Sequence, residues 1–194
     1  MTTDLSTFSD ALSKNPLLVP ESRFSDCQRA LKNQKLSLSQ ASRLIESDPA
    51  LATTVLGHVN RARANSDALE ICSIVSAINL LGEGAARTLL GKVSVLEHKI
   101  REKPIVDDCL RLIDRMLHAS IYCKHWAELR GDGAPSEAKL SALLKDIGEL
   151  AVCTYHNDVF REIRAVASTS QVSSSFAAQK VLGFSYADLG RELG

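Results

Sequence analysis

The chain has 194 residues and a mass of 21.1 kDa, which is enough for one ordinary domain with its own core. Lysine plus arginine and aspartate plus glutamate both number 23, so the formal net charge is zero and argues against charge-driven binding to nucleic acid or to an anionic membrane. Aromatic residues make up only 5%, which leaves few side chains on which bases could stack.

No run of about 18 uncharged apolar residues occurs, so we expect no transmembrane helix. The N-terminus lacks the basic and apolar regions of a secretory signal. Five cysteines are widely spaced and form no CxxC pair. We therefore expect a cytoplasmic protein whose cysteines are free, mostly buried thiols.

Apolar residues recur at spacings of three and four along the chain, and no clean alternation of period two appears. This periodicity predicts an all-α fold. In the first half we expect helices that begin near Thr3, Ser22, Ser37, Pro49, Ser73 and Gly84. The segment 16–20 begins and ends with proline, and it should be extended because proline disfavours helix in the residue before it.

Two of these helices have clear start signals. Asp48 followed by Pro49 is the strongest, since aspartate is a good N-cap and proline suits the first helical position. Ser37 with Gln40 has the spacing of a capping box. Gly82 should end the apolar helix that comes next in the chain.

Pro104 separates the chain into two halves, for which we predict bounds of 1–103 and 104–194. In the second half we expect helices over residues 105–130, 136–155, 159–167, 176–182 and 186–194. Loops should connect them at 131–135, which is rich in glycine, and at 168–175, which is rich in serine. The inward face of the long helix should carry Val106, Cys109, Ile113, Met116, Leu117 and Ile121.

The segment 38–52 has the length of a helix-turn-helix DNA reader. A recognition helix presents its N-terminal residues to base edges. Here that end carries Glu46 and Asp48, and no basic residue follows until Arg61, so negative charge would face the phosphates. The sequence therefore argues against DNA reading.

A metal site is a second hypothesis, based on His118 in the long helix and Asp146 in the next one. A metal phosphohydrolase needs several converging ligands, and two are too few. His125, two turns after His118, would be a third. The alternative is that His118 is a hydrogen-bonded, half-buried histidine and that Asp146 caps a helix or forms an ion pair.

Several segments, taken in chain order, are similar to the motifs of one family. They are residues 16–20 (Pro-Leu-Leu-Val-Pro), 45–51 (Ile-Glu-Ser-Asp-Pro-Ala-Leu), 58–60, 74–82, 118–120, 143–150 (Leu-Leu-Lys-Asp-Ile-Gly-Glu-Leu) and 182–190. On these motifs the chain resembles the HDOD domains, bacterial signalling relatives of the HD phosphohydrolases. The resemblance extends over residues 16–194.

The departures from the family pattern concern the residues that would bind metal. Lys145 stands at the histidine of the His-Asp pair, so that only Asp146 of the pair remains. A protonated amine cannot ligate a metal ion and repels it. Tyr186 stands at a later histidine position, and Arg61 and Arg63 lie where an Asn-Ser and aromatic pattern is usual.

We therefore predict an all-α, multi-helix bundle in which an N-terminal helical lobe packs on a degenerate HD-like helical lobe. The resemblance implies a non-catalytic module of bacterial signal transduction that acts through protein–protein contact, with no catalytic residue, metal or cofactor. The expected partner is a protein rather than a membrane or a nucleic acid, and the oligomeric state is left open. The alternative is a residual metal-dependent phosphohydrolase that acts on a nucleotide or a cyclic dinucleotide.

Two regions are candidate binding surfaces. One is the cleft in which His118, Lys145 and Asp146 would converge, and the other is the loop with Asn60, Arg61 and Arg63. Lys145 could bind an anion such as phosphate where an ancestral site bound metal. The alternative is a solvated lysine that pairs with Glu149, four residues later on the same helix face.

Overall fold

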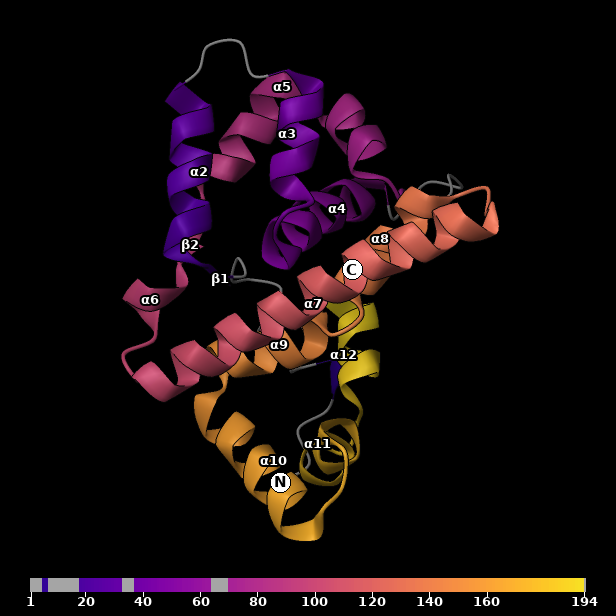
Figure 1. Cartoon of the computed structure of the whole chain (residues 1–194). Helices are drawn as coiled ribbons and strands as arrows, with labels where there is room; N and C mark the ends of the chain where they lie inside the picture. The colour runs from indigo at the N-terminus through magenta and orange to yellow at the C-terminus, as the bar shows by residue number, and fades with distance from the viewer. Residues whose placement is uncertain (1–4, 7–17, 33–36, 64–69, 194) are drawn as a thin grey trace.

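The long helix α7 (Lys103–Arg130) crosses the middle of the molecule, and the other elements are arranged around it (Figure 1). The computed structural model describes residues 5–6, 18–32, 37–63 and 70–193. Apart from two strands of two residues each, the regular structure in this part of the chain is helical, which confirms the predicted all-α class. None of the described helices is both long enough and apolar enough to span a membrane.

Before α7 the elements are β1 (Leu18–Val19), α2 (Glu21–Lys32), α3 (Leu38–Ile45), α4 (Pro49–Arg63), α5 (Ile74–Gly91), β2 (Ser94–Val95) and α6 (Leu96–Lys99). After it come α8 (Pro135–Leu144), α9 (Ile147–Tyr155), α10 (Asn157–Ser170), α11 (Ser174–Leu182) and α12 (Tyr186–Leu193).

Helices α2 to α5 lie on one side of α7, and α10 and α11 lie on the other side, at the far end of the molecule (Figure 1). Helix α4 packs against α7, α8 and α9, so it joins the first group of helices to the second. The predicted bounds 1–103 and 104–194 meet where α7 begins. The division into two lobes stays a prediction.

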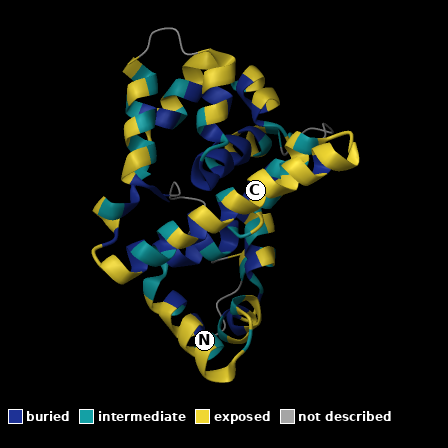
Figure 2. Cartoon of the chain, viewed as in Figure 1, coloured by how far each residue is buried: buried dark blue, intermediate teal, exposed yellow. Residues whose placement is uncertain are grey.

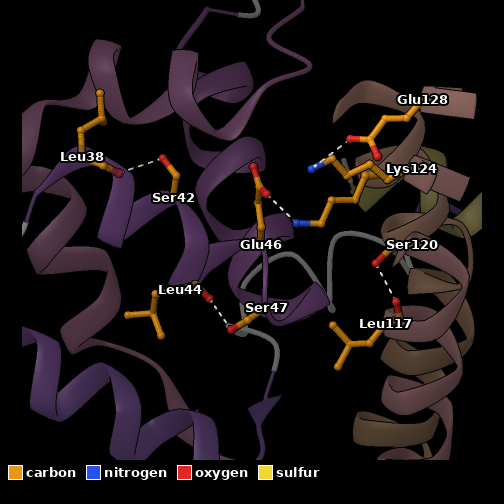
Figure 3. A network of polar contacts seen from close by, with 10 residues as sticks. Leu38, Ser42, Leu44, Glu46, Ser47, Leu117, Ser120, Lys124 and Glu128 are labelled. Carbon is orange, nitrogen blue, oxygen red and sulfur yellow. Dashed lines mark hydrogen bonds and ion pairs between the residues drawn. The ribbon is translucent and has the colours of Figure 1, made fainter. Parts of the chain in front are cut away.

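An ion pair also connects the two groups. Glu46, at the corner between α3 and α4, accepts a hydrogen bond from Lys139 of α8, with 2.6 Å between Nζ and Oε2. Figure 3 shows Glu46 pointing from this corner toward the α7 side, where Lys124 pairs with Glu128. About three quarters of each side chain in the Glu46–Lys139 pair is covered, so water screens this pair less than an exposed one.

The start signals predicted at Ser37 and Asp48 are confirmed, whereas the helix start predicted near Thr3 lies outside the described residues. Ser37 accepts a hydrogen bond from the backbone of Gln40, and the Gln40 side chain accepts one from the backbone of Ser37, which completes the capping box. Asp48 Oδ1 accepts hydrogen bonds from the backbone amides of Ala50 and Leu51 at 2.8 and 3.1 Å, and so caps α4. These bonds satisfy amides that have no partner within the helix.

Asp48 is completely buried, which gives it a predictable effect on stability. Burial raises the pKa of its carboxyl to about 6, although the two backbone amides act in the opposite direction. The folded protein therefore holds this proton more tightly than the unfolded chain does. The stability that the proton contributes is fully present below about pH 4 and is lost as the pH rises through about 6.

We expect Asp48 to lower the free energy of unfolding by up to about 3 kcal/mol between pH 4 and pH 7. Asp48→Asn keeps an oxygen that can cap α4 but carries no charge, so this contribution to the pH dependence should vanish. Urea unfolding at pH 4, 5, 6 and 7 would measure it. The matched control is Asp132→Asn, at an exposed aspartate. If the free energies of unfolding of Asp48→Asn and of the wild type change with pH in the same way, burial does not raise the pKa of Asp48.

The extended segment before α2 is confirmed where it is described. Leu18 and Val19 form β1, which pairs in parallel with β2, Leu18 opposite Ser94 and Val19 opposite Val95. Residues 16 and 17, which begin the predicted segment, lie outside the described residues. Both β1 residues are buried, so this short pair belongs to the core.

Three helix bounds were predicted wrongly. No separate helix begins near Gly84: that segment is joined to the preceding helix across a kink at Gly82, where φ is 75°. The merged helix α5 ends at Gly91 and is followed by β2 and α6. The predicted helix 136–155 is two helices, α8 and α9, because the backbone of Asp146 leaves helical geometry with φ −103° and ψ 21°. The predicted connector 168–175 is mostly helical and turns at Gln171, where φ is 51°. Each break occupies at most four residues, which is too short for a periodicity of 3.6 to resolve.

The expectation that all cysteines are free thiols was also wrong. Cys109 of α7 and Cys153 of α9 form a disulfide, and both residues are fully buried. Cys27, Cys72 and Cys123 are free. The sequence placed Cys109 and Cys153 in separate helices, 44 residues apart, and only the packing of α9 on α7 brings them together.

The core continues along the inner face of α7, as Figure 2 shows by its dark-blue positions. Val106, Cys109, Ile113 and Met116 are buried there as predicted, and Leu117 is half-buried. Ile121, however, is 60% exposed, together with other large apolar residues of the last turns of α7. The continuous apolar inward face of α7 therefore ends at Met116 and Leu117. Beyond them, only Ser120 and Ala127 of this helix are buried.

Candidate functional site

Two carboxylates that are far from α7 in sequence converge on one arginine of this helix. Arg115 donates to Asp146 Oδ2 at 3.2 Å and to Glu149 Oε2 at 2.7 Å. Asp146 stands at the corner between α8 and α9, and Glu149 lies in the first turn of α9. The break between the two helices therefore turns both side chains toward Arg115.

Two residues from the C-terminal helices complete the site. Ser174, in the first turn of α11, donates a hydrogen bond to Glu149 Oε1 at 2.8 Å. Tyr186, in the first turn of α12, is buried nearby, and burial together with the negative charge of Glu149 raises the pKa of its phenol. We refer to Arg115, Asp146, Glu149, Ser174 and Tyr186 as the Arg115 site.

Gly148 allows α12 to approach this closely. A Cβ atom at Gly148 would lie 2.1 Å from the carbonyl oxygen of Tyr186 and 3.0 Å from the backbone nitrogen of Gly190. Both are backbone atoms, which cannot rotate away. The glycine of the Asp-Ile-Gly segment is therefore required for the contact that places Tyr186 beside Glu149.

A second set of ion pairs borders the Arg115 site. Asp108 of α7 accepts from Arg111 of the same helix and from Arg164 of α10. Burial would raise the pKa of Asp108, but the hydrogen bonds and charges of Arg164 and Arg111 outweigh it and lower the pKa. A cavity of about 370 Å³ lies between these residues and the Arg115 site, bounded by Leu112 and Phe160.

The Arg115 site is a cation bound to carboxylates. Burial would lower the pKa of the Arg115 guanidinium, but Glu149 and Asp146 raise it, so this group stays charged. A guanidinium holds carboxylate oxygens with directed hydrogen bonds and neutralises them. The described part of the chain contains no group of three or more histidine, cysteine, aspartate or glutamate side chains that could hold a metal ion.

Within the described part of the chain, no hydrogen bond or ion pair connects His118, Lys145 and Asp146, the residues of the predicted cleft. His118 is exposed, and its Nδ1 lies 2.8 Å from the backbone oxygen of Asp114 in its own helix, so it is not half-buried as the alternative proposed. Lys145 is exposed and lines a groove between α7 and α8. The described residues show no ion pair between Lys145 and Glu149, because Glu149 pairs with Arg115 instead. That Asp146 forms an ion pair is confirmed.

The second predicted region is not a loop where it is described. Asn60, Arg61 and Arg63 belong to the last turn of α4, and residues 64–69 lie outside the described residues. Asn60 Oδ1 accepts from the backbone amide of Ile71 at 2.9 Å, and its amide group donates to the carbonyl of the same residue. Asn60 therefore fastens the chain that returns to α5. Arg61 is exposed, and whether these residues bind a partner stays a prediction.

Sequence reasoning missed Arg115. It precedes Asp146 by 31 residues and is one of 23 basic residues in the chain, and no local pattern distinguishes it. For Tyr186 the sequence shows only a departure from the family pattern. What connects these residues is the packing of α9 against both α7 and α12, and one sequence contains no direct signal for it.

Three solved structures are similar to this chain, and the two of MmoQ share its architecture. A crystal structure of the MmoQ response regulator from Methylococcus capsulatus superposes with a TM-score of 0.72 at 18% identity, over 92% of this chain and 70% of that chain. A second structure of MmoQ gives 0.70 at 18% identity, over 92% and 68%. An HDOD domain protein of unknown function from Geobacter sulfurreducens gives 0.44 at 18% identity, over 96% and 64%.

No curated protein matches the chain in sequence. The MmoQ likeness, at this low identity, shows the fold. The HDOD domain model matches residues 17–194, which is nearly the whole chain and includes the Arg115 site with the Asp-Pro and Asp-Ile-Gly segments. The chain therefore belongs to the HDOD domain family.

Proposed function

We propose that this HDOD chain is a non-catalytic regulatory module that acts in signal transduction through protein–protein contact. The observation that carries the proposal is the pairing of Arg115 with both Asp146 and Glu149. Membership of the HDOD family and a fold shared with a protein described as a response regulator support a role in signalling.

The Arg115 pairing argues against hydrolysis for an electrostatic reason. Metal-assisted hydrolysis needs carboxylate and histidine ligands around a divalent ion that activates water. Here a permanent cation occupies the carboxylates, and a metal ion would have to displace it against charge repulsion. Lys145, at the position of the family's ligating histidine, faces the groove between α7 and α8 instead.

DNA binding has no comparable support. The first turn of α4, which would be the base-reading end of a helix-turn-helix, consists of the buried residues Pro49, Ala50 and Leu51. A recognition helix must expose this end to enter the major groove. We therefore favour a protein partner over nucleic acid.

The test is metal content together with phosphodiester turnover. We expect the purified protein to hold far less than one ion per chain after incubation with Mn²⁺, Fe²⁺ or Mg²⁺ and removal of the excess. Hydrolysis of bis(4-nitrophenyl) phosphate and of a cyclic dinucleotide should equal the buffer rate. Asp146→Asn and Glu149→Gln should change neither result. Stoichiometric metal or turnover in the wild type that these variants abolish would show that the chain is an enzyme.

A further inference from the structure

The last three turns of α7 expose an apolar face that has no cover among the described residues. Ile121, Tyr122, Trp126 and Leu129 are 60%, 64%, 68% and 74% exposed. With His118 and His125 they follow the spacing i, i+3, i+4, i+7, i+8, i+11, which puts all six on one side of the helix. None of the six is lysine, arginine, aspartate or glutamate.

The same side of the first half of α7 is built differently. There the exposed positions include Arg111 and Arg115, and both have ion-pair partners in Asp108, Asp146 and Glu149. The solvent side of this helix thus changes from paired charges to large apolar groups. An apolar face of this size on one helix marks a contact surface rather than an ordinary solvated one.

A groove lies beside this face, between α7 and α8. Its volume is about 720 Å³, and its lining includes Tyr122 and Trp126 of α7 and Ala138, Ser141 and Ala142 of α8. The α8 wall consists of small side chains, whereas Tyr122 and Trp126 form a bulky wall on α7. A row of small residues beside a ridge of large ones is the shape into which another helix packs.

The charged side chains of this groove have a net positive charge. Arg130 and Lys145 contribute two cations and Asp132 one anion, and within the described part of the chain none of the three forms an ion pair. These cations stand at the edge of an otherwise apolar groove. They suit an occupant that has carboxylates beside an apolar face.

We propose that the α7–α8 groove binds an acidic amphipathic helix of a partner protein. Tyr122 and Trp126 would cover its apolar face, and Arg130 and Lys145 would pair with its carboxylates. Such binding follows the helix-in-groove mode, in which apolar residues at i, i+3 or i+4 and i+7 anchor the helix. This inference rests on the proposed function and names the surface through which the module would act.

A second copy of the chain fits this surface less well. A twofold axis places the same patch of both subunits face to face. Both copies would then bring the groove with Arg130, Lys145 and Asp132 into one interface. Four cations and two aspartates would meet there, which opposes association.

Trp126 is the single tryptophan of the chain, so its fluorescence reports on this groove alone. The probes are two designed helical peptides of 18 residues with the same leucines at i, i+3, i+4 and i+7. One carries glutamate and the other lysine at the flanking positions. We expect the acidic peptide to shift the Trp126 emission to shorter wavelength in a saturable manner, and to bind at least about tenfold more tightly than the basic one.

Charge reversal on the protein provides the sharpest control. The double variant Arg130→Glu and Lys145→Glu should invert the preference, so that the basic peptide binds more tightly. Leu80→Ser changes an apolar side chain that is 54% exposed on α5, away from the groove, and should leave both affinities unchanged. All of these positions are on the surface, so the variants should keep the far-UV circular dichroism of the wild type.

Four results would overturn the inference. They are equal affinity for both peptides, a preference that survives charge reversal, a blue shift that grows with protein concentration while the mass doubles, and a blue shift caused only by phosphatidylglycerol vesicles. The third result would assign the face to a second copy, and the fourth to a membrane. All four leave the metal and turnover assay unaffected, so failure of this inference is distinct from failure of the proposed function.

Discussion

Gly148→Ala is expected to lower the free energy of unfolding by about 3 kcal/mol or more, the upper range for overpacking in a core. The new Cβ would lie 2.1 Å from the carbonyl oxygen of Tyr186, where no side-chain rotation can relieve the clash. Helix α12 would have to move away from α9, and this would separate Tyr186 from Glu149. Urea unfolding followed by circular dichroism measures the loss.

Gly84→Ala is the matched control for this substitution. Gly84 lies in the second half of α5, and a Cβ there would meet nothing within 4 Å. Alanine should raise stability by about 0.5–1 kcal/mol, because glycine loses more backbone entropy on entering a helix. If Gly148→Ala is as stable as the wild type, the backbone of α12 does not lie against Gly148 of α9.

Reduction of the Cys109–Cys153 disulfide is expected to lower the free energy of unfolding by a similar amount. In the chain-entropy account, a cross-link across a separation of 44 residues stabilises the fold by about 4 kcal/mol. For a chain of this size that corresponds to a fall of about 2 M in the urea midpoint. The double variant Cys109→Ala and Cys153→Ala should unfold at the same urea concentration with and without reductant.

Alkylation of the unfolded protein tests the bond directly. Without reductant, only the three free cysteines should be labelled, and with reductant all five. Mass spectrometry of the whole chain separates these outcomes. Five labels without reductant would mean that Cys109 and Cys153 are thiols in the purified protein.

Local physics made much of the helix pattern predictable. The caps at Ser37 and Asp48 depend on residues within three positions of each other, so their side-chain chemistry is visible in the sequence. The same applies to the kink at Gly82, a residue that adopts positive φ without strain. The family was also within reach, because its motifs are short segments with a fixed order.

The helix bounds and the exposed face of α7 were harder to predict. Periodicity shows which residues share a face, but it does not show whether another helix covers that face. Ile121 continues the apolar pattern of α7 and was placed inward, yet α7 carries apolar residues on two sides of its last turns. Only the position of α8 distinguishes the covered side from the open one.

What the sequence determined by itself is therefore local or contained in short motifs: the all-α class, the helix starts, the HDOD resemblance and the replacement of a ligating histidine by Lys145. The tertiary structure alone decided which cation meets Asp146. Arg115 meets this carboxylate because the chain breaks at Asp146 and α9 turns back against α7, while Lys145, one residue earlier, faces the groove. Pairings across 31 or 44 residues depend on how helices pack, and packing is set by the whole set of buried contacts rather than by any segment.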